Sequence, residues 1–214
     1  MHTLARPPVR EAHLKDQARL RAFTLIELLT VIGIIAILAA ITFGVVKGVN
    51  ERAAISQAKA ELASLSQALE AYKLQYGDYP QAGTSAAATN ASAVTNTQTQ
   101  YILFNSLVGK RGPRGADIAG KNFIEISKFS LLSAVAANLP ASTGSTQVAN
   151  AFVDPWGRLY VFYYRGSTAW TQNSNYILLS AGPDGNLGVS VNSTTGVMTE
   201  SNAAQAADNI YANR

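Results

Sequence analysis

The longest apolar stretch of the chain lies close to its N-terminus, at residues 23–46. Glu27 is the single charged residue within it. As an α-helix rising about 1.5 Å per residue, the stretch would be about 36 Å long and would cross a hydrocarbon core of about 30 Å. The pattern therefore predicts a membrane-spanning helix. A plain signal-anchor has the same pattern, and the Leu-Ala-Ala sequence at 38–40 leaves open a cleavable secretory signal.

A second pattern follows without a break, at residues 47–77. Its apolar side chains recur three and four positions apart, which places them on one face of a helix. This stripe consists of Ile55, Ala58, Leu62, Leu65, Leu69, Tyr72 and Tyr76. We predict an amphipathic helix that packs against the chain's own head, with a coiled coil as the alternative. Gly77 and Pro80 are typical of the end of a helix.

Residues 78–214 alternate short regular elements with turns, as is typical of a small globular head. Residues 81–100 are polar and lack periodicity, so we predict a surface loop there. The expected helical segments are 101–108 and 131–137, and the expected strands are 123–126, 159–164, 175–180 and a weaker hairpin of 187–191 with 196–199. The predicted fold class is α+β, with the long helix packed on a small, mostly antiparallel sheet.

Positive charge is concentrated at the start of the chain. The first 22 residues contain five basic and two acidic residues, and the net charge of the whole chain is +4. Because the cytoplasmic flanks of membrane helices carry an excess of Lys and Arg, the N-terminus is predicted to be cytoplasmic and the head to lie across the membrane. The nearly balanced remainder lacks the basic surface expected of a nucleic-acid-binding protein.

Few groups in the sequence could serve catalysis. The chain has no cysteine, and both histidines lie within the first 22 residues. Loss of that segment would exclude Cys–His and Ser–His–Asp catalysis and zinc sites with the usual ligands. Only carboxylates remain, and the two candidates, Asp154 and Asp184, stand in turns rich in Pro and Gly. We predict that the protein is not an enzyme; a membrane-anchored hydrolase using these two acids is the alternative.

Glu27 places a charge inside an otherwise uncharged apolar segment. A carboxylate inside a membrane helix costs about 2.5–3.5 kcal/mol, so it normally has a partner. Residues 23–46 contain no Lys, Arg or His that could serve it. Cleavage of the chain before Phe23 would create an α-amine four residues away, in the same chain or in a neighbouring one. A position near enough to the membrane surface for snorkelling or protonation is the alternative.

The sequence around Glu27 reads RAFTLIELL at residues 21–29. Together with the basic leader and the apolar run, it resembles the cleavage and methylation signature of type IV prepilins and type II secretion pseudopilins. The resemblance implies that a prepilin peptidase cuts between Ala22 and Phe23 and that Phe23 is then N-methylated. It also implies that Glu27 pairs with the Phe23 amine of an adjacent subunit as helices pack into a filament. The family usually has Gly before the cut, where this chain has Ala22.

A second resemblance lies in the C-terminal half. Residues 154–160 read DPWGRLY and residues 176–185 read YILLSAGPDG. These segments are similar to the major pseudopilins of type II secretion, whose last loop carries a calcium ion. Carried over to this chain, the ligands would be Asp184, the carbonyl of Ala181, Asp208 and Asn209. Oxygen ligands of this kind suit Ca²⁺, although Asn209 brings one charge fewer than the family's second acid.

The expected organisation is a basic prepilin leader at 1–22, a transmembrane assembly helix at 23–46, an amphipathic helix at 47–77 and a pilin-like head at 78–214. The expected function is that of a structural subunit of a type II secretion pseudopilus. The chain would pass once through the inner membrane, with a periplasmic head, and would then assemble into a periplasmic filament that drives protein export. Its partners would be further copies of itself, the prepilin peptidase, minor pseudopilins, the inner-membrane secretion platform and the membrane. A type IV pilin for adhesion, motility or DNA uptake is the alternative.

Overall fold

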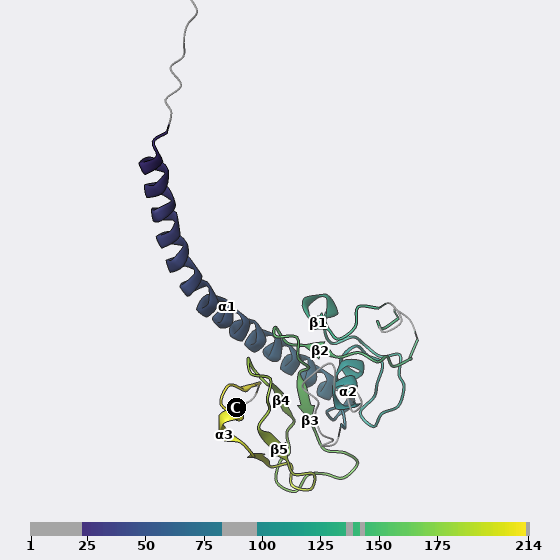
Figure 1. The fold of residues 1–214 in the computed structure, drawn as a ribbon. Helices are drawn as coiled ribbons and strands as arrows, with labels where there is room; N and C mark the ends of the chain where they lie inside the picture. The colour runs from purple at the N-terminus through teal and green to yellow at the C-terminus, as the bar shows by residue number, and fades with distance from the viewer. Residues whose placement is uncertain (1–22, 83–97, 136–138, 142–143, 213–214) are drawn as a thin grey trace, which may run out of the picture. The chain divides into compact units, whose positions relative to one another are not determined.

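The computed structural model describes residues 23–82, 98–135, 139–141 and 144–212. The predicted leader and most of the predicted loop at 81–100 lie outside these residues. Figure 1 shows the elements in chain order. They are α1 (Leu25–Tyr76), α2 (Gln98–Leu107), η2 (Ile126–Lys128), β1 (Ser130–Leu131), β2 (Phe152–Val153), β3 (Val161–Tyr163), β4 (Ile177–Ser180), β5 (Val189–Val191), β6 (Met198–Glu200), α3 (Ala203–Ala206) and β7 (Ile210–Tyr211).

The chain divides into two compact units, residues 1–46 and 47–214, and helix α1 contributes to both. In the first unit, the large apolar side chains between residues 23 and 41 are all more than half exposed, from Phe23 at 82% to Val31 at 51%. A continuous apolar surface of this kind marks a site of contact with lipid or with other protein. No helix in the described part of the chain combines the length and the apolar character that crossing a membrane requires. The transmembrane segment at 23–46 stays a prediction.

In the second unit, the outer part of α1 packs against the head, as its stripe of apolar residues predicts. The side chains of Ala58, Leu65, Leu69 and Tyr72 are fully buried in the hydrophobic core. Helix α1 ends at Tyr76, and Gly77 follows with a positive φ of 80° and donates its N–H to the Lys73 carbonyl at 2.7 Å. Glycine adopts this left-handed conformation without the penalty of a side chain, which confirms the predicted helix end.

The strands of the described residues form three small antiparallel sheets rather than one. The central sheet has the order β3–β4–β7, and the other two are the pairs β1–β2 and β5–β6. Strand β3 pairs with β4 through Phe162 opposite Leu178, and β4 pairs with β7 through Ser180 opposite Ile210. The predicted strands at 159–164 and 175–180 are confirmed as β3 and β4, and the predicted hairpin is confirmed as β5 and β6. The α+β class is therefore correct.

Two predicted elements of the head are wrong. Residues 123–126 form no strand; Ile124 is buried in an irregular segment that leads into η2. Residues 131–135 form no helix, since Leu131 pairs with Phe152 in the β1–β2 ladder, and residues 136–138 lie outside the described part. Both segments are apolar because they pack on the core, and burial of a short run does not by itself determine its backbone conformation.

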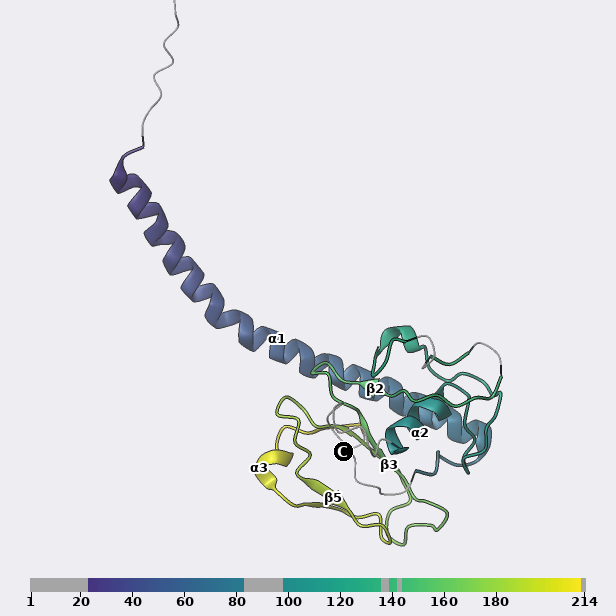
Figure 2. The ribbon, with the colours of Figure 1, turned by 45° about the vertical axis from the view of Figure 1, so that its right-hand side comes forward.

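The remaining elements cover opposite sides of the head. In both views, α3 and β5 lie on one side and α2 and β2 on the other (Figures 1 and 2). Helix α2 contacts β3 and starts three residues earlier than predicted. Strand β7 brings the C-terminal residues beside β4. This pairing positions the loop that follows β4.

Candidate functional site

The N-terminal candidate residues lie at the first turn of α1. The Glu27 carboxylate (Oε2) accepts hydrogen bonds from the backbone N–H and the hydroxyl of Thr24, both at 2.9 Å. In return, the Glu27 N–H donates to Thr24 Oγ1 at 3.2 Å. This reciprocal arrangement is a capping box, which satisfies N–H groups that the first turn of a helix leaves unpaired.

Thr24 was missed as a functional residue by the sequence reasoning, although the Thr-x-x-Glu spacing at 24–27 is a known signal for a capping box. The structure shows that Glu27 has partners within its own chain and that its carboxylate is turned toward the start of the helix. It is thereby held beside the position where a new amine at Phe23 would appear. The predicted cut lies between Ala22, outside the described residues, and Phe23, within them.

The two segments that carry the C-terminal candidate ligands come together where β7 returns beside β4. The Asp184 N–H donates to Asp208 Oδ2 at 2.9 Å. Gly182 lies so close to Asp208 that a Cβ added to it would overlap the Asp208 carbonyl. Ala181, which precedes Gly182, is fully buried. The pairing of Ser180 with Ile210 thus places the segment of Ala181 and Asp184 beside the segment of Asp208 and Asn209.

Two side-chain oxygens at this loop are available for a cation. Asp208 Oδ1 and Asn209 Oδ1 are both buried and accept no hydrogen bond from the described residues. The amide of Asn209 is oriented by its Nδ2, which donates to the Leu187 carbonyl at 2.6 Å. Both residues line a pocket of about 350 Å³. Unpaired buried oxygens are costly, so their presence fits a site for a hard cation such as Ca²⁺.

Other features of the loop are less like a metal site. The Asp184 carboxylate is exposed and accepts from the backbone N–H of Asn186 at 2.7 Å, so it shapes its own turn. Among the described residues, no group of three or more His, Cys, Asp or Glu side chains is arranged to hold a metal ion. A cation here would depend on carbonyl and amide oxygens as well as on the two acids.

The Asp154 carboxylate stabilises the turn in which it lies. Asp154 is 2% exposed, and its Oδ1 accepts from the N–H groups of Trp156 and Arg158 at 3.0 and 2.9 Å. Its Oδ2 accepts from the Ser180 hydroxyl at 2.6 Å. A carboxylate that is buried and fully hydrogen-bonded in this way is closed to a substrate. The geometry therefore does not support the alternative of a hydrolase using Asp154.

Two further groups near this turn were not recognised from the sequence. Arg158 Nη1 donates to the carbonyls of Gly182 and Pro183 at 2.6 and 2.8 Å. Glu61 on α1 is 8% exposed and accepts from the Tyr160 hydroxyl at 2.6 Å. Burial, and next the hydrogen bond to Glu61, raise the pKa of Tyr160, so its hydroxyl stays a donor at neutral pH. Tyr160 thereby ties the Asp-Pro-Trp-Gly segment to the long helix.

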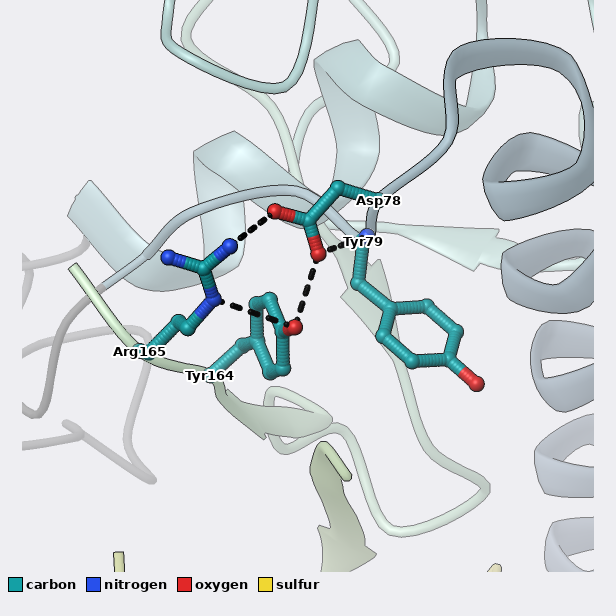
Figure 3. A network of polar contacts seen from close by, with 4 residues as sticks. All are labelled: Asp78, Tyr79, Tyr164 and Arg165. Carbon is teal, nitrogen blue, oxygen red and sulfur yellow. Dashed lines mark hydrogen bonds and ion pairs between the residues drawn. The ribbon is translucent and has the colours of Figure 1, made fainter. Parts of the chain in front are cut away.

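A polar network holds the end of α1 against the end of β3 (Figure 3). The Asp78 carboxylate lies between Arg165, which donates from Nη2 at 2.5 Å, and the Tyr164 hydroxyl, which donates at 2.7 Å. The Tyr79 N–H also donates to Asp78, at 2.9 Å. Burial, and next the hydrogen bond to Asp78, raise the pKa of Tyr164. The network fixes the turn that follows α1 and contributes to the fold rather than to chemistry.

Comparison with known proteins gives two family matches, one over the first part of α1 and one from the rest of α1 to residue 111. The profile described as "Prokaryotic N-terminal methylation motif" matches residues 18–43, and the one described as "Type II secretion system (T2SS), protein G" matches residues 45–111. The chain is 29% identical, over 168 residues, to the type II secretion system core protein G of Escherichia coli (strain K12), an alignment that covers 78% of this chain and 85% of that protein. No solved structure was found to match. With a methylation motif at residues 18–43 followed by a protein G match, and with this identity over most of its length, the chain is similar to type II secretion protein G.

Proposed function

We propose that the protein is a structural subunit of a type II secretion pseudopilus, which assembles by helix packing into a periplasmic filament that drives protein export. The observation that carries the proposal is the methylation motif in register with a protein G head on one continuous helix. The exposed apolar side chains between residues 23 and 41 support it, because a filament of packed helices would cover them.

Before assembly, the same apolar segment anchors the chain in the inner membrane, with a cytoplasmic N-terminus and a periplasmic head. Its partners are further copies of the chain, the prepilin peptidase, minor pseudopilins and the inner-membrane secretion platform. The similarity to a core protein of a type II secretion system supports assembly with other components of such a system. The proposed roles are structural: Glu27 sets the register in which the helices pack, and the head forms the filament surface. We propose no catalytic step for the chain.

The proposal predicts a processed N-terminus. In a host that has the prepilin peptidase, mass spectrometry of the membrane-extracted protein should show a chain that begins at N-methyl-Phe23. The Ala22→Gly variant, which places the family's usual residue before the cut, should be processed at least as completely. A chain that still begins at Met1 in the presence of the peptidase would contradict the proposal.

We further propose that the loop after β4 binds Ca²⁺ through the Ala181 carbonyl, Asp184, Asp208 and Asn209. The unpaired oxygens of Asp208 and Asn209 support this assignment. A bound ion would neutralise two carboxylates and would join the loop to the C-terminal segment. Because the head has no disulfide, such a link would add stability that the chain cannot gain from sulfur.

Calcium is therefore expected to raise the melting temperature of the purified full-length chain in detergent. At a free concentration about 100 times the dissociation constant, a bound ligand adds about 2.7 kcal/mol, or roughly 5–10 °C for a protein of this size. EGTA should remove this rise, and Asp208→Ala should abolish it. Glu125→Gln, which removes a carboxylate from an exposed ion pair with Lys128, is the matched control and should keep it. A midpoint that is unchanged by EGTA would rule out the calcium site.

A further inference from the structure

The loop at 181–185 is contacted by charged residues from two different parts of the chain. Asp208 accepts the Asp184 N–H through Oδ2, and its backbone carbonyl lies against the Gly182 α-carbon. Arg158 binds the same loop through the Gly182 and Pro183 carbonyls. Gly182 thus contacts both the proposed metal ligand Asp208 and a cation that belongs to the protein itself.

The guanidinium of Arg158 fits closely into the loop. A Cβ added to Gly185 would overlap Arg158 Nε and Cζ, so the loop packs directly against the guanidinium group. Gly185 has a φ of +74°, which a residue with a side chain rarely adopts. A side chain at Gly185 is therefore disfavoured for two reasons: the backbone conformation and the close approach of Arg158.

Arg158 is itself held in place by a rigid turn. Its backbone N–H donates to Asp154 Oδ1 at 2.9 Å, and its carbonyl accepts from the Asp154 N–H at 2.7 Å. Asp154 is in turn joined to Ser180, and the Ser180 hydroxyl accepts the Gly182 N–H at 3.1 Å. The turn at 154–158 and the loop after β4 are therefore one hydrogen-bonded unit, with the Arg158 charge at its centre.

We propose that Arg158 is a built-in cation of this loop, which keeps the loop folded without a bound metal ion and opposes the binding of a divalent cation. A guanidinium bonded to two carbonyls supplies the positive charge that an oxygen-lined loop otherwise takes from a metal ion. Two cations on neighbouring atoms of one short loop repel each other, so each lowers the stabilisation that the other can add. The inference rests on the proposed calcium site.

The test compares melting temperatures of the full-length chain in detergent, with EGTA and with excess calcium, for the wild type and Arg158→Met. Methionine keeps much of the side-chain length but removes the charge and the donors. In EGTA the variant should melt about 5 °C below the wild type, because two charge-assisted hydrogen bonds are lost. Calcium should then raise its midpoint by roughly 3 °C more than it raises that of the wild type, because the repulsion is gone.

Two further variants separate this effect from general destabilisation. Arg165→Met removes a different arginine of the head, the partner of Asp78, and should lower the midpoint without changing the calcium-dependent rise. Arg158→Lys keeps the charge and should keep the calcium response of the wild type. An equal or smaller calcium-dependent rise in Arg158→Met than in the wild type would overturn the inference. Failure of every variant, the wild type included, to respond to calcium would refute the calcium site and the inference together, while leaving processing at Phe23 and filament assembly unaffected.

Discussion

A Glu27→Ala variant is expected to be cleaved like the wild type and to be lost from filaments. The proposed cut lies between Ala22 and Phe23, before the carboxylate of Glu27, so we expect the peptidase not to need that carboxylate. Assembly is expected to need it, because Glu27 is the single charged residue at 23–46 that could bind a neighbouring amine. Loss of a charge-assisted contact of about 1.5–3 kcal/mol at each subunit would reduce association by a factor of about 10–100 or more. Immunoblots would report cleavage, and the yield of sheared or cross-linked filaments would report assembly.

Two variants give this experiment its controls. Glu51→Ala removes an exposed acid from α1 outside the motif and should assemble normally. Thr24→Val removes the hydroxyl of the capping box but keeps the carboxylate of Glu27. If Thr24→Val lost assembly as completely as Glu27→Ala, helix capping would explain the effect without any pairing between subunits. Normal filaments from Glu27→Ala would contradict the proposed pairing directly.

The largest loss of stability in the head is expected from Asp154→Ala. The change leaves two backbone N–H groups and the buried Ser180 hydroxyl without their acceptor. An unpaired buried polar group costs about 1–3 kcal/mol, so we expect a total of about 3 kcal/mol or more, which corresponds to roughly 10 °C in melting temperature. Thermal denaturation of the full-length chain in EGTA would measure this loss without a contribution from calcium.

Asp184→Ala is the matched variant, since it removes a carboxylate from the neighbouring turn. Asp184 is exposed and bonds only within its own turn through its carboxylate, so we expect a loss of about 1 kcal/mol or less in EGTA. Equal losses from the two variants would show that the buried network around Asp154 does not stabilise the head. If the wild type hydrolysed a glycoside substrate and both variants lost this activity while still folded, the hydrolase interpretation would be restored.

Much of the fold follows from local pattern. The spacing of Leu62, Leu65 and Leu69 predicts the buried face of α1, and Gly77 predicts its end, because a helix repeats every 3.6 residues along the sequence itself. The aromatic and β-branched runs predict β3 and β4 for a similar reason. The two-residue strands β1, β2 and β7 could not be predicted, since so short a segment has no period and becomes a strand only when a partner lies beside it.

The candidate sites divide in the same way. Residues 21–29 are adjacent in the sequence, so the family resemblance and the Thr-x-x-Glu spacing are both visible there without a structure. The hydrogen bonds of Arg158, Ser180 and Glu61 could not be predicted from the sequence, because their partners lie 24, 26 and 99 residues away. A sequence records which groups can donate or accept a hydrogen bond, but not which of them folding will bring within 3 Å of each other.

The linear order of residues is therefore sufficient for the long helix, its apolar first part, its acid at the first turn and the family that the chain resembles. The arrangement around the loop after β4 depended on the folded head. There the β4–β7 pairing places Asp208 against Gly182, and the turn at 154–158 places Arg158 within hydrogen-bond distance of the Gly182 carbonyl. The physical reason is that helical periodicity and capping act between residues a few positions apart, whereas burial and long-range hydrogen bonds exist only after distant segments have packed together.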